Sequence, residues 1–248
     1  MARLQSLWRW VMPALGLAAW VAVLGLLVGL SAWQIRRAEE KTQRIDAFAQ
    51  AQANPGDEAP DERVAQRRAA EEAVFIKACV TGRYDAGRQF LLDGQVQDGQ
   101  AGLHVWTPLL RQEGTPVMVD RGWVAQKADR GPAEPIGADG AERTVCGMLT
   151  RFPRSGWRLP APPEATAWPR NVVYPERGDL EAALDAPVYP LLLLLDPLAP
   201  DGFRRHWQPV SLGPERHYGY AVQWAGLAVT WVIATIAYRR RHRRATDR

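Results

Sequence analysis

The sequence predicts a membrane protein in which two transmembrane helices flank an α+β domain that is mainly antiparallel β, with a barrel- or sandwich-like architecture. Three observations indicate this class. No charged residue occurs from Trp10 to Ile35, and none from Tyr218 to Tyr238. Each run meets the roughly 18–20 apolar residues that a spanning helix needs. Between the two runs lies a series of short strand-like segments bounded by turn residues.

The first uncharged run is predicted to stay in the protein as a membrane anchor. Its length exceeds the roughly 7–15 residues of a signal-peptide core. The sequence Trp33-Gln34-Ile35-Arg36-Arg37 that follows it is a poor cleavage site. A mitochondrial leader is not indicated, because no Arg- and Ser-rich amphipathic segment precedes the run.

The charge distribution predicts the orientation in the membrane. Of the 31 Lys and Arg residues, eight lie before the first run or after the second, and with the single acid Asp247 they give these tails a charge of +7. The region between the runs carries −3, so the basic balance does not indicate nucleic-acid binding. Positive segments remain in the cytoplasm. We therefore expect a multi-pass protein of the bacterial inner (plasma) membrane, with both termini cytoplasmic and a periplasmic central domain.

The composition divides the chain into six segments. They are a cytoplasmic N-terminus at 1–9, a transmembrane helix at 10–35, a charged helix and polar linker at 36–73, an extracytoplasmic β-rich domain at 74–216, a transmembrane helix at 217–238 and a basic cytoplasmic tail at 239–248. The linker is the stretch 51–63, which is rich in Pro, Gly and acids. A short helix through Glu71 and Glu72 is expected to lead into the domain.

Eight strands are predicted in the central domain. They are Val74–Thr81, Gln89–Asp93, Leu103–Leu110, Val117–Val124, Thr144–Leu149, Asn171–Tyr174, Leu191–Asp196 and Phe203–Gln208. Glu113-Gly114 predicts a hairpin between the third and fourth. The run Leu191–Leu195 does not alternate, so it should be buried on both faces. Asp179 is expected to cap a short helix that ends at Leu184.

The two cysteines, Cys79 and Cys146, lie in apolar strand-like runs. An exported domain would permit a disulfide between them. Their separation does not establish one, and the sequence favours buried free thiols. No CxxC motif and no Cys/His metal spacing occurs.

The second uncharged run begins with the best candidate for cofactor chemistry. On a helix, His217, Tyr220, Trp224, Ala228 and Trp231 fall within an arc of about 80°. This places a histidine above a mostly aromatic wall, and a neutral imidazole is a ligand for metals and haem iron. The alternative is that these residues are interfacial anchors, because Trp and Tyr are enriched at membrane boundaries.

Four motifs stand in order along nearly the whole chain. They are Trp33-Gln34-Ile35-Arg36-Arg37 with Lys41; Gly82-Arg83-Tyr84; Gly102-Leu103-His104-Val105-Trp106-Thr107-Pro108-Leu109 with Val119-Asp120-Arg121-Gly122-Trp123-Val124; and the segment beginning at His217. With these motifs and its two-span layout, the chain resembles the Surfeit locus protein 1 family of assembly factors for haem–copper cytochrome oxidase. It departs from the family at Ala225, where a large aromatic residue is usual, and the linker at 51–63 resembles an insertion.

The resemblance implies a non-enzymatic role in cytochrome c oxidase assembly, assisting the delivery or insertion of haem a into subunit I. His217 would bind the haem iron, and Tyr220 and Trp224 would contact the macrocycle. Arg216 and Arg37 would pair with the propionates. Oxidase subunit I, other oxidase assembly factors and membrane lipid are the implied partners.

Small residues indicate that the two spans contact each other. Gly25 and Gly29 form a small-xxx-small pair in the first span, and Ala221 and Ala225 form one in the second. Such contact would bring Trp33 and Gln34 near His217.

In the central domain, Arg121, Gly122 and Trp123 follow Asp120 and indicate either an ion pair with a turn or a partner-docking surface, and the structural role is favoured. His104 and His206 are expected to be packed or surface residues.

Two other classes of function stay open. An enzyme is disfavoured, since the sequence has no Gly-x-Ser-x-Gly, P-loop or HExxH motif and no carboxylate pair with a supporting histidine; no catalytic residue is assigned. The alternative is a membrane-anchored scaffold that binds a protein partner without a cofactor, in which His217 is only an anchor.

Overall fold

The structure, a computed structural model, describes residues 2–71, 74–153, 167–209 and 213–246, with the side chains of the first helix described from residue 14 onward. The chain forms two compact units. The helical unit comprises Met1–Asp46 and Pro209–Arg248, and the β unit comprises Ala47–Gln208.

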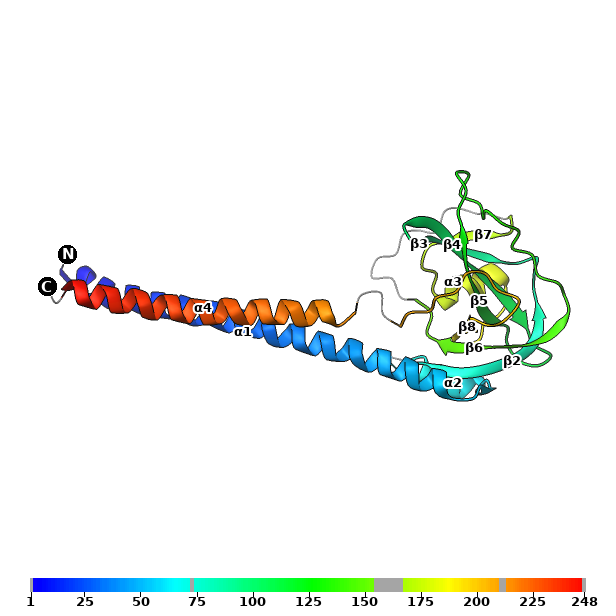
Figure 1. Cartoon of the computed structure of the whole chain (residues 1–248), viewed down its shortest axis with the longest axis horizontal. Coiled ribbons are helices and arrows are strands. Elements are labelled where there is room, and N and C mark those ends of the chain that lie inside the picture. The colour runs from blue at the N-terminus through cyan, green and yellow to red at the C-terminus, as the bar shows by residue number, and fades with distance from the viewer. Residues whose placement is uncertain (1, 72–73, 154–166, 210–212, 247–248) are drawn as a thin grey trace. The chain divides into compact units, whose positions relative to one another are not determined.

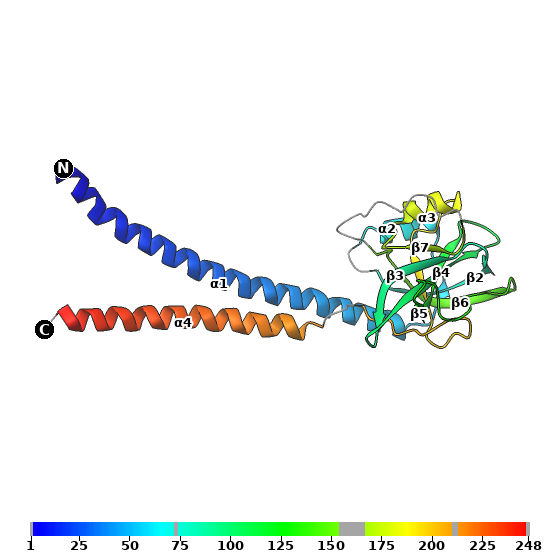
Figure 2. The ribbon, with the colours of Figure 1, turned by 90° about the horizontal axis from the view of Figure 1, so that it is seen from above.

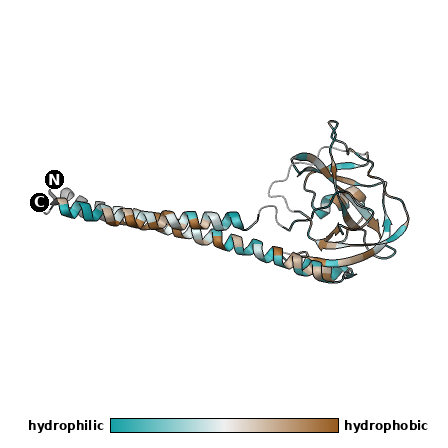
Figure 3. Ribbon diagram, viewed as in Figure 1, coloured by the Kyte–Doolittle hydropathy of each residue, from teal (hydrophilic) through white to brown (hydrophobic). Residues whose placement is uncertain are grey.

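The helical unit contains α4 (Glu215–Thr246) and most of α1 (Ala2–Ala53), whose last residues belong to the β unit. The N-terminal end of α1 and the C-terminal end of α4 lie at the same end of this unit (Figures 1 and 2). Both helices are long and apolar enough to cross a membrane. Figure 3 shows hydrophobic residues along much of their length and hydrophilic residues at the C-terminal end of α4. At about 1.5 Å per residue, α1 measures roughly 78 Å, well beyond the roughly 30 Å of a hydrocarbon core. Part of α1 must therefore lie outside the bilayer in a membrane-spanning chain.

One face of each helix packs against the other. The less exposed side chains recur every three or four residues, on α1 at Trp20, Leu24, Leu27, Ser31 and Gln34, and on α4 at His217, Ala221, Trp224, Ala228, Val232 and Thr235. Trp20 Nε1 donates to Thr235 Oγ1 at 2.8 Å, and Ser31 Oγ donates to the Ala221 carbonyl at 3.0 Å. The helices are antiparallel, and the expected contact between the spans is confirmed.

The small residues that allow this contact differ from those predicted. Ala221 is buried, but Ala225 is exposed. Gly25 and Gly29 are exposed, and a Cβ added to either would meet nothing within 4 Å. The small-xxx-small pattern therefore identified Ala221 correctly. The packed face of α1 is set instead by Ser31 and Gln34, which form hydrogen bonds to α4.

The β unit contains one eight-stranded mixed sheet with two short helices (Figures 1 and 2). Its elements are β1 (Asp57–Glu58), α2 (Glu62–Arg68), β2 (Ile76–Tyr84), β3 (Phe90–Gln97), β4 (Gln100–Leu110), β5 (Val117–Ala125), β6 (Glu142–Thr150), β7 (Arg170–Val172), α3 (Arg177–Leu184) and β8 (Leu192–Leu195). The order is β1-β2-β6-β8-β5-β4-β3-β7. β2 also pairs with β4. The five strands β2-β6-β8-β5-β4 therefore form a closed ring of hydrogen-bonded neighbours.

Most strand pairs are antiparallel, as the sequence predicts, while β1–β2, β3–β7 and β5–β8 are parallel. The predicted segments from Val74–Thr81 to Leu191–Asp196 all coincide with strands to within a few residues. The Glu113-Gly114 hairpin joins β4 to β5. Leu193 and Leu195, on one face of β8, are at most 1% exposed, and Leu192, on the other face, is 2% exposed. Both faces of the strand are therefore covered, with Leu194 half-buried.

Three local predictions are wrong. Phe203–Gln208 forms no strand, and only Arg204 makes a bridge, to Trp123. Asp179 is not the cap of α3: the N-cap is Glu176, and Asp179 accepts its backbone N–H in a capping box. The helix that leads into the domain is α2, at Glu62–Arg68, rather than one through Glu71 and Glu72; Glu72 lies outside the described residues.

The close approach of β2 to β4 explains the glycine of the Gly82-Arg83-Tyr84 motif. Arg83 and Tyr84 pair with Leu110 and Leu109. A Cβ at Gly82 would lie 2.4 Å from the Leu110 carbonyl oxygen, a distance that no side chain tolerates. Glycine is therefore required where the two strands meet.

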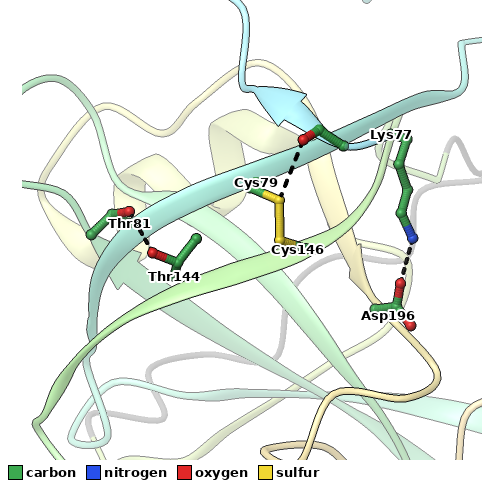
Figure 4. Close-up of a disulfide and its surroundings, with 7 residues drawn as sticks. Lys77, Cys79, Thr81, Thr144, Cys146 and Asp196 are labelled. Carbon is green, nitrogen blue, oxygen red and sulfur yellow. Dashed lines mark hydrogen bonds and ion pairs between the residues drawn. A yellow bond between two sulfur atoms is a disulfide. The ribbon is translucent and has the colours of Figure 1, made fainter. Parts of the chain in front are cut away.

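Cys79 and Cys146 form a disulfide between β2 and β6, where they are direct register partners (Figure 4). The favoured expectation of free thiols is therefore wrong. Strand register, which brings residues 67 positions apart in sequence into contact, could not be read from the spacing of the cysteines. The disulfide is flanked by the Thr81–Thr144 hydrogen bond of 2.9 Å, between the same two strands, and by the Lys77–Asp196 ion pair, which joins β2 to the residue after β8 (Figure 4).

Removal of this cross-link should destabilise the β unit. A disulfide that closes a loop of this length restricts the unfolded chain, so we expect the Cys79→Ser/Cys146→Ser double variant to lose about 2–4 kcal/mol of unfolding free energy. The measurement is urea unfolding of the full chain in detergent, with and without dithiothreitol. Dithiothreitol should lower the urea concentration at the unfolding midpoint of wild type and leave that of the double variant unchanged. Equal midpoints for both proteins without reductant would contradict the cross-link.

Candidate functional site

The predicted cofactor residue His217 is held by a polar contact within the helical unit. His217 lies in the first turn of α4, and its Nδ1 lies 2.7 Å from Gln34 Oε1 on α1. Gln34 is only 9% exposed. An amide oxygen accepts hydrogen bonds and cannot donate them, so the Nδ1 atom carries the proton. In the neutral form of the ring the lone pair is then on Nε2.

The other predicted cofactor residues differ in how exposed they are. Trp224 is half-buried on the α4 face that meets α1, and Tyr220 is 53% exposed beside that face. Arg216 is exposed. Arg37 is exposed and pairs with Glu40 at 2.5 Å. The helical unit thus brings Gln34 and His217 into contact, with Trp224 about two turns further along the same face of α4, while Tyr220 and the two arginines are exposed.

Trp33, the neighbour of Gln34 in the first motif, is 49% exposed. It lies off the packed face of α1, as expected of an interfacial side chain. The two residues of the Trp33-Gln34 pair therefore have separate roles: Gln34 contacts α4, and Trp33 faces outward.

A multidentate metal centre is absent from the described part of the chain. No group of three or more His, Cys, Asp or Glu side chains there is arranged to hold an ion. Haem needs only one or two axial protein ligands, because the macrocycle supplies the other four nitrogens. The donor set of the helical unit, a single oriented imidazole next to aromatic side chains, fits haem and not a bare metal ion.

In the β unit, the carboxylate of Asp120 is the centre of a second polar cluster. Asp120 is 3% exposed and accepts hydrogen bonds from three donors. His104 Nδ1 lies 2.9 Å from Oδ2 and 3.0 Å from Oδ1, and Trp106 Nε1 donates to Oδ2 at 2.9 Å. The backbone N–H of Gly122 donates to Oδ1 at 3.0 Å. The buried Trp106 indole thereby has the partner that its N–H requires.

A β-bulge at Arg121 and Gly122 creates this arrangement. His104 pairs with Trp123 and Trp106 pairs with Asp120, so two residues of β5 oppose one residue of β4. Gly122 has φ of +111°, which L side chains rarely adopt. The bulge turns Asp120 toward both β4 side chains. The ion pair of this motif joins Asp120 to His104, whereas Arg121 donates to backbone carbonyls.

Charge pairing shifts the ionisation of His104. Burial disfavours the charged imidazole, but the adjacent Asp120 carboxylate outweighs this through its charge and hydrogen bond and raises the pKa of His104 above its usual value. His104 is half-buried and its ring lies 5.5 Å from that of Trp207. The sequence analysis expected a packed or surface His104 and did not predict this ion pair. The pattern that could have indicated it is that His104 and Trp106 lie on the same face of one strand. His206 is exposed.

Comparison with known proteins identifies the family. The family model described as SURF1 family matches residues 21–229, most of the chain. The chain belongs to the SURF1 family. This is the Surfeit locus protein 1 family that the four motifs resemble, and its members are known as cytochrome c oxidase assembly factors. The match runs from within α1 to within α4, so it includes both polar clusters. No curated protein matches the chain.

Membership of the SURF1 family makes this chain part of an assembly-factor family and not of a catalytic one. It implies an interaction with the oxidase. The two apolar helices indicate a membrane-anchored protein.

Replacing Asp120 by Asn should alter both stability and its pH dependence. The variant loses charge-assisted hydrogen bonds, and we expect a loss of roughly 1.5–3 kcal/mol near pH 6. Because the folded pKa of His104 exceeds the ordinary value of about 6.5, the ion pair stabilises fully below that pH, and its contribution is lost as the pH rises through the folded pKa. Urea unfolding at about pH 6 and about pH 9 measures this effect. The difference in unfolding free energy between wild type and Asp120→Asn should be smaller at the higher pH.

The matched control is Asp98→Asn, which neutralises an exposed aspartate 3.6 Å from Arg204. It should change stability by less than about 1 kcal/mol. A gap between wild type and Asp120→Asn that stays constant over the pH range would contradict the ion pair.

Proposed function

We propose that this chain receives or holds haem a during assembly of subunit I of cytochrome c oxidase, with His217 as ligand of the iron. The observation that carries the proposal is the hydrogen bond from His217 Nδ1–H to Gln34. Histidines that bind metals commonly donate their other ring N–H to an acceptor, which fixes the tautomer and the ring orientation. Gln34 supplies that acceptor from the opposite helix.

Each surrounding side chain has a defined part in this proposal. Haem a, when bound, supplies an iron that accepts the Nε2 lone pair and two propionates that need cations. Trp224 and Tyr220 offer apolar, aromatic surface for the macrocycle. Arg216 and Arg37 offer guanidinium groups for the propionates. The exposed Arg37–Glu40 pair does not prevent this, because exposed ion pairs contribute only about 0.2–1 kcal/mol.

The orientation follows from the charges and is part of the proposal. Lys and Arg at both termini favour the cytoplasmic side. His217 then lies near the outer surface of the bacterial inner membrane, and the β unit lies in the periplasm. From there the β unit is available to contact subunit I or other oxidase assembly factors.

Replacing His217 by Ala should abolish haem ligation. Full-length protein purified from cells that make haem a is expected to carry pigment, and the His217→Ala variant should lose the Soret and α-band absorption. The measurement is the visible spectrum normalised to protein concentration. The control is His242→Ala, which changes a histidine in the basic C-terminal tail. Wild-type protein without haem, or an unchanged spectrum in His217→Ala, would contradict the proposal.

Replacing Gln34 by Leu should weaken ligation without removing the ligand. Leucine has a similar volume but accepts no hydrogen bond, so the His217 ring loses its fixed tautomer. Loss of such a partner typically costs 10–100-fold in metal affinity, and we expect that decrease in a haem titration of the apo protein. Gln34→Glu keeps an acceptor and should retain most of the affinity. Equal affinity for wild type and Gln34→Leu would show that Gln34 does not orient His217.

Oxidase assembly in cells separates this role from that of a scaffold without a cofactor. The haem role predicts that His217→Ala impairs assembly. A scaffold role predicts normal assembly in His217→Ala and defective assembly after changes at Arg121 or Trp123. The second pattern would favour the scaffold.

A further inference from the structure

We propose that the β unit contains a binding site for one small monovalent inorganic anion, formed by Tyr84, Arg121 and Arg205. Tyr84 belongs to the Gly82-Arg83-Tyr84 motif, and Arg121 belongs to the bulge of β5. Neither haem nor the oxidase enters this inference, so it does not depend on the proposed function.

Buried hydrogen-bond donors of Tyr84 and Arg205 have no acceptor among the residues that the structure describes. Tyr84 is 4% exposed, and its buried hydroxyl has no hydrogen-bond partner. Two further buried donors nearby, Arg205 Nε and Nη1, have none either, although Arg205 Nη2 donates to the Ala199 carbonyl at 2.6 Å. Leaving such groups unpaired costs about 1–3 kcal/mol each, and more for a charged group. An acceptor shared by these donors would remove the cost.

The arrangement of guanidinium groups is the second observation. The Cζ atoms of Arg121 and Arg143 lie 5.1 and 5.6 Å from the centre of the Tyr84 ring. Arg121 is 5% exposed and uses its nitrogens on the carbonyls of Asp201, Ile136 and Gly137. Those partners are neutral, and the carboxylate of Asp201, which acts on the charge of Arg121, is already paired with Arg143.

The charge balance indicates a monovalent occupant. Three carboxylates belong to the cluster: Asp201 and Asp139, which pair with Arg143, and Asp196, which pairs with Lys77. The four cations are Lys77, Arg121, Arg143 and Arg205. The cluster therefore carries one uncompensated positive charge. A buried charge without a counter-charge is strongly unfavourable, and one monovalent anion would neutralise it.

The phenol is suited to donate to an anion. Burial raises the pKa of Tyr84 to about 12, despite the opposing effect of Arg121. The hydroxyl thus keeps its proton at neutral pH and offers it to an acceptor. Charge-assisted hydrogen bonds of this type are roughly twice as strong as neutral ones.

The bulge contributes through the stem of Arg205. A Cβ at Gly122 would lie 2.7 Å from Arg205 Cγ, so glycine at this position leaves room for the stem of the arginine. The same residue also donates its N–H to Asp120. One glycine therefore serves both the Asp120 cluster and the placement of Arg205.

Chloride is the probe for this site. The full chain in detergent should unfold at a higher temperature in sodium chloride than in sodium gluconate of equal ionic strength, because gluconate is too large for a buried site. The increase should saturate as chloride replaces gluconate, as expected for a ligand that binds only the folded state. Tryptophan fluorescence reports unfolding, and broadening of the chloride NMR line reports binding directly.

Tyr84→Phe is the decisive variant, since it removes only the hydroxyl. It should lose most of the chloride-dependent stabilisation and line broadening. The control is Tyr189→Phe, whose hydroxyl donates to the Pro60 carbonyl at 2.6 Å; this variant should be less stable in both salts yet keep the chloride effect. Equal wild-type unfolding in the two salts with no line broadening would overturn the proposal and favour a bound water. Full chloride dependence in Tyr84→Phe would overturn the assignment of Tyr84 even if chloride binds elsewhere.

Discussion

The hydrogen bond between His217 and Gln34 is the interaction on which the account of the helical unit depends. It joins two residues that are 183 positions apart in sequence, and it lies on the same packed face as the Ser31 and Trp20 hydrogen bonds. Polar contacts across apolar helices fix rotation and register, because an unpaired polar group in hydrocarbon is costly. The same contact determines which nitrogen of His217 faces outward. Helix packing and the proposed ligation of haem are therefore linked in one pair of side chains.

The β unit follows a similar principle with a different centre. The Asp120 carboxylate receives donors from two strands and from the backbone of the bulge that positions it. Residues of the family motifs, Gly82 at the β2–β4 contact and Gly122 in the bulge, allow approaches that a side chain would block. The motifs of this unit thus specify backbone geometry first, and the polar clusters depend on that geometry.

Much of this fold was predictable from local patterns. Alternation and turn residues located most strands, and the absence of charge located both long helices. Contacts set by strand register were not predictable: the Cys79–Cys146 disulfide and the His104–Asp120 pair each join neighbouring strands whose alignment no spacing rule gives. The Gln34–His217 contact was anticipated because each residue lies at the end of its uncharged run that is next to the central domain. The glycines of α1 were assigned wrongly because small residues are common in spanning helices whether or not they pack.

The tautomer of His217 is the central claim, and nitrogen NMR of the apo protein labelled in its four histidines tests it most directly. Signals of His217 are assigned by their loss in His217→Asn. At about pH 8.5, where an ordinary imidazole is neutral, the account predicts a protonated Nδ1 and an unprotonated Nε2 in wild type. It also predicts that Gln34→Leu loses this preference. A wild-type His217 with its proton on Nε2 would contradict the account, because the nitrogen meant for iron would then have no free lone pair.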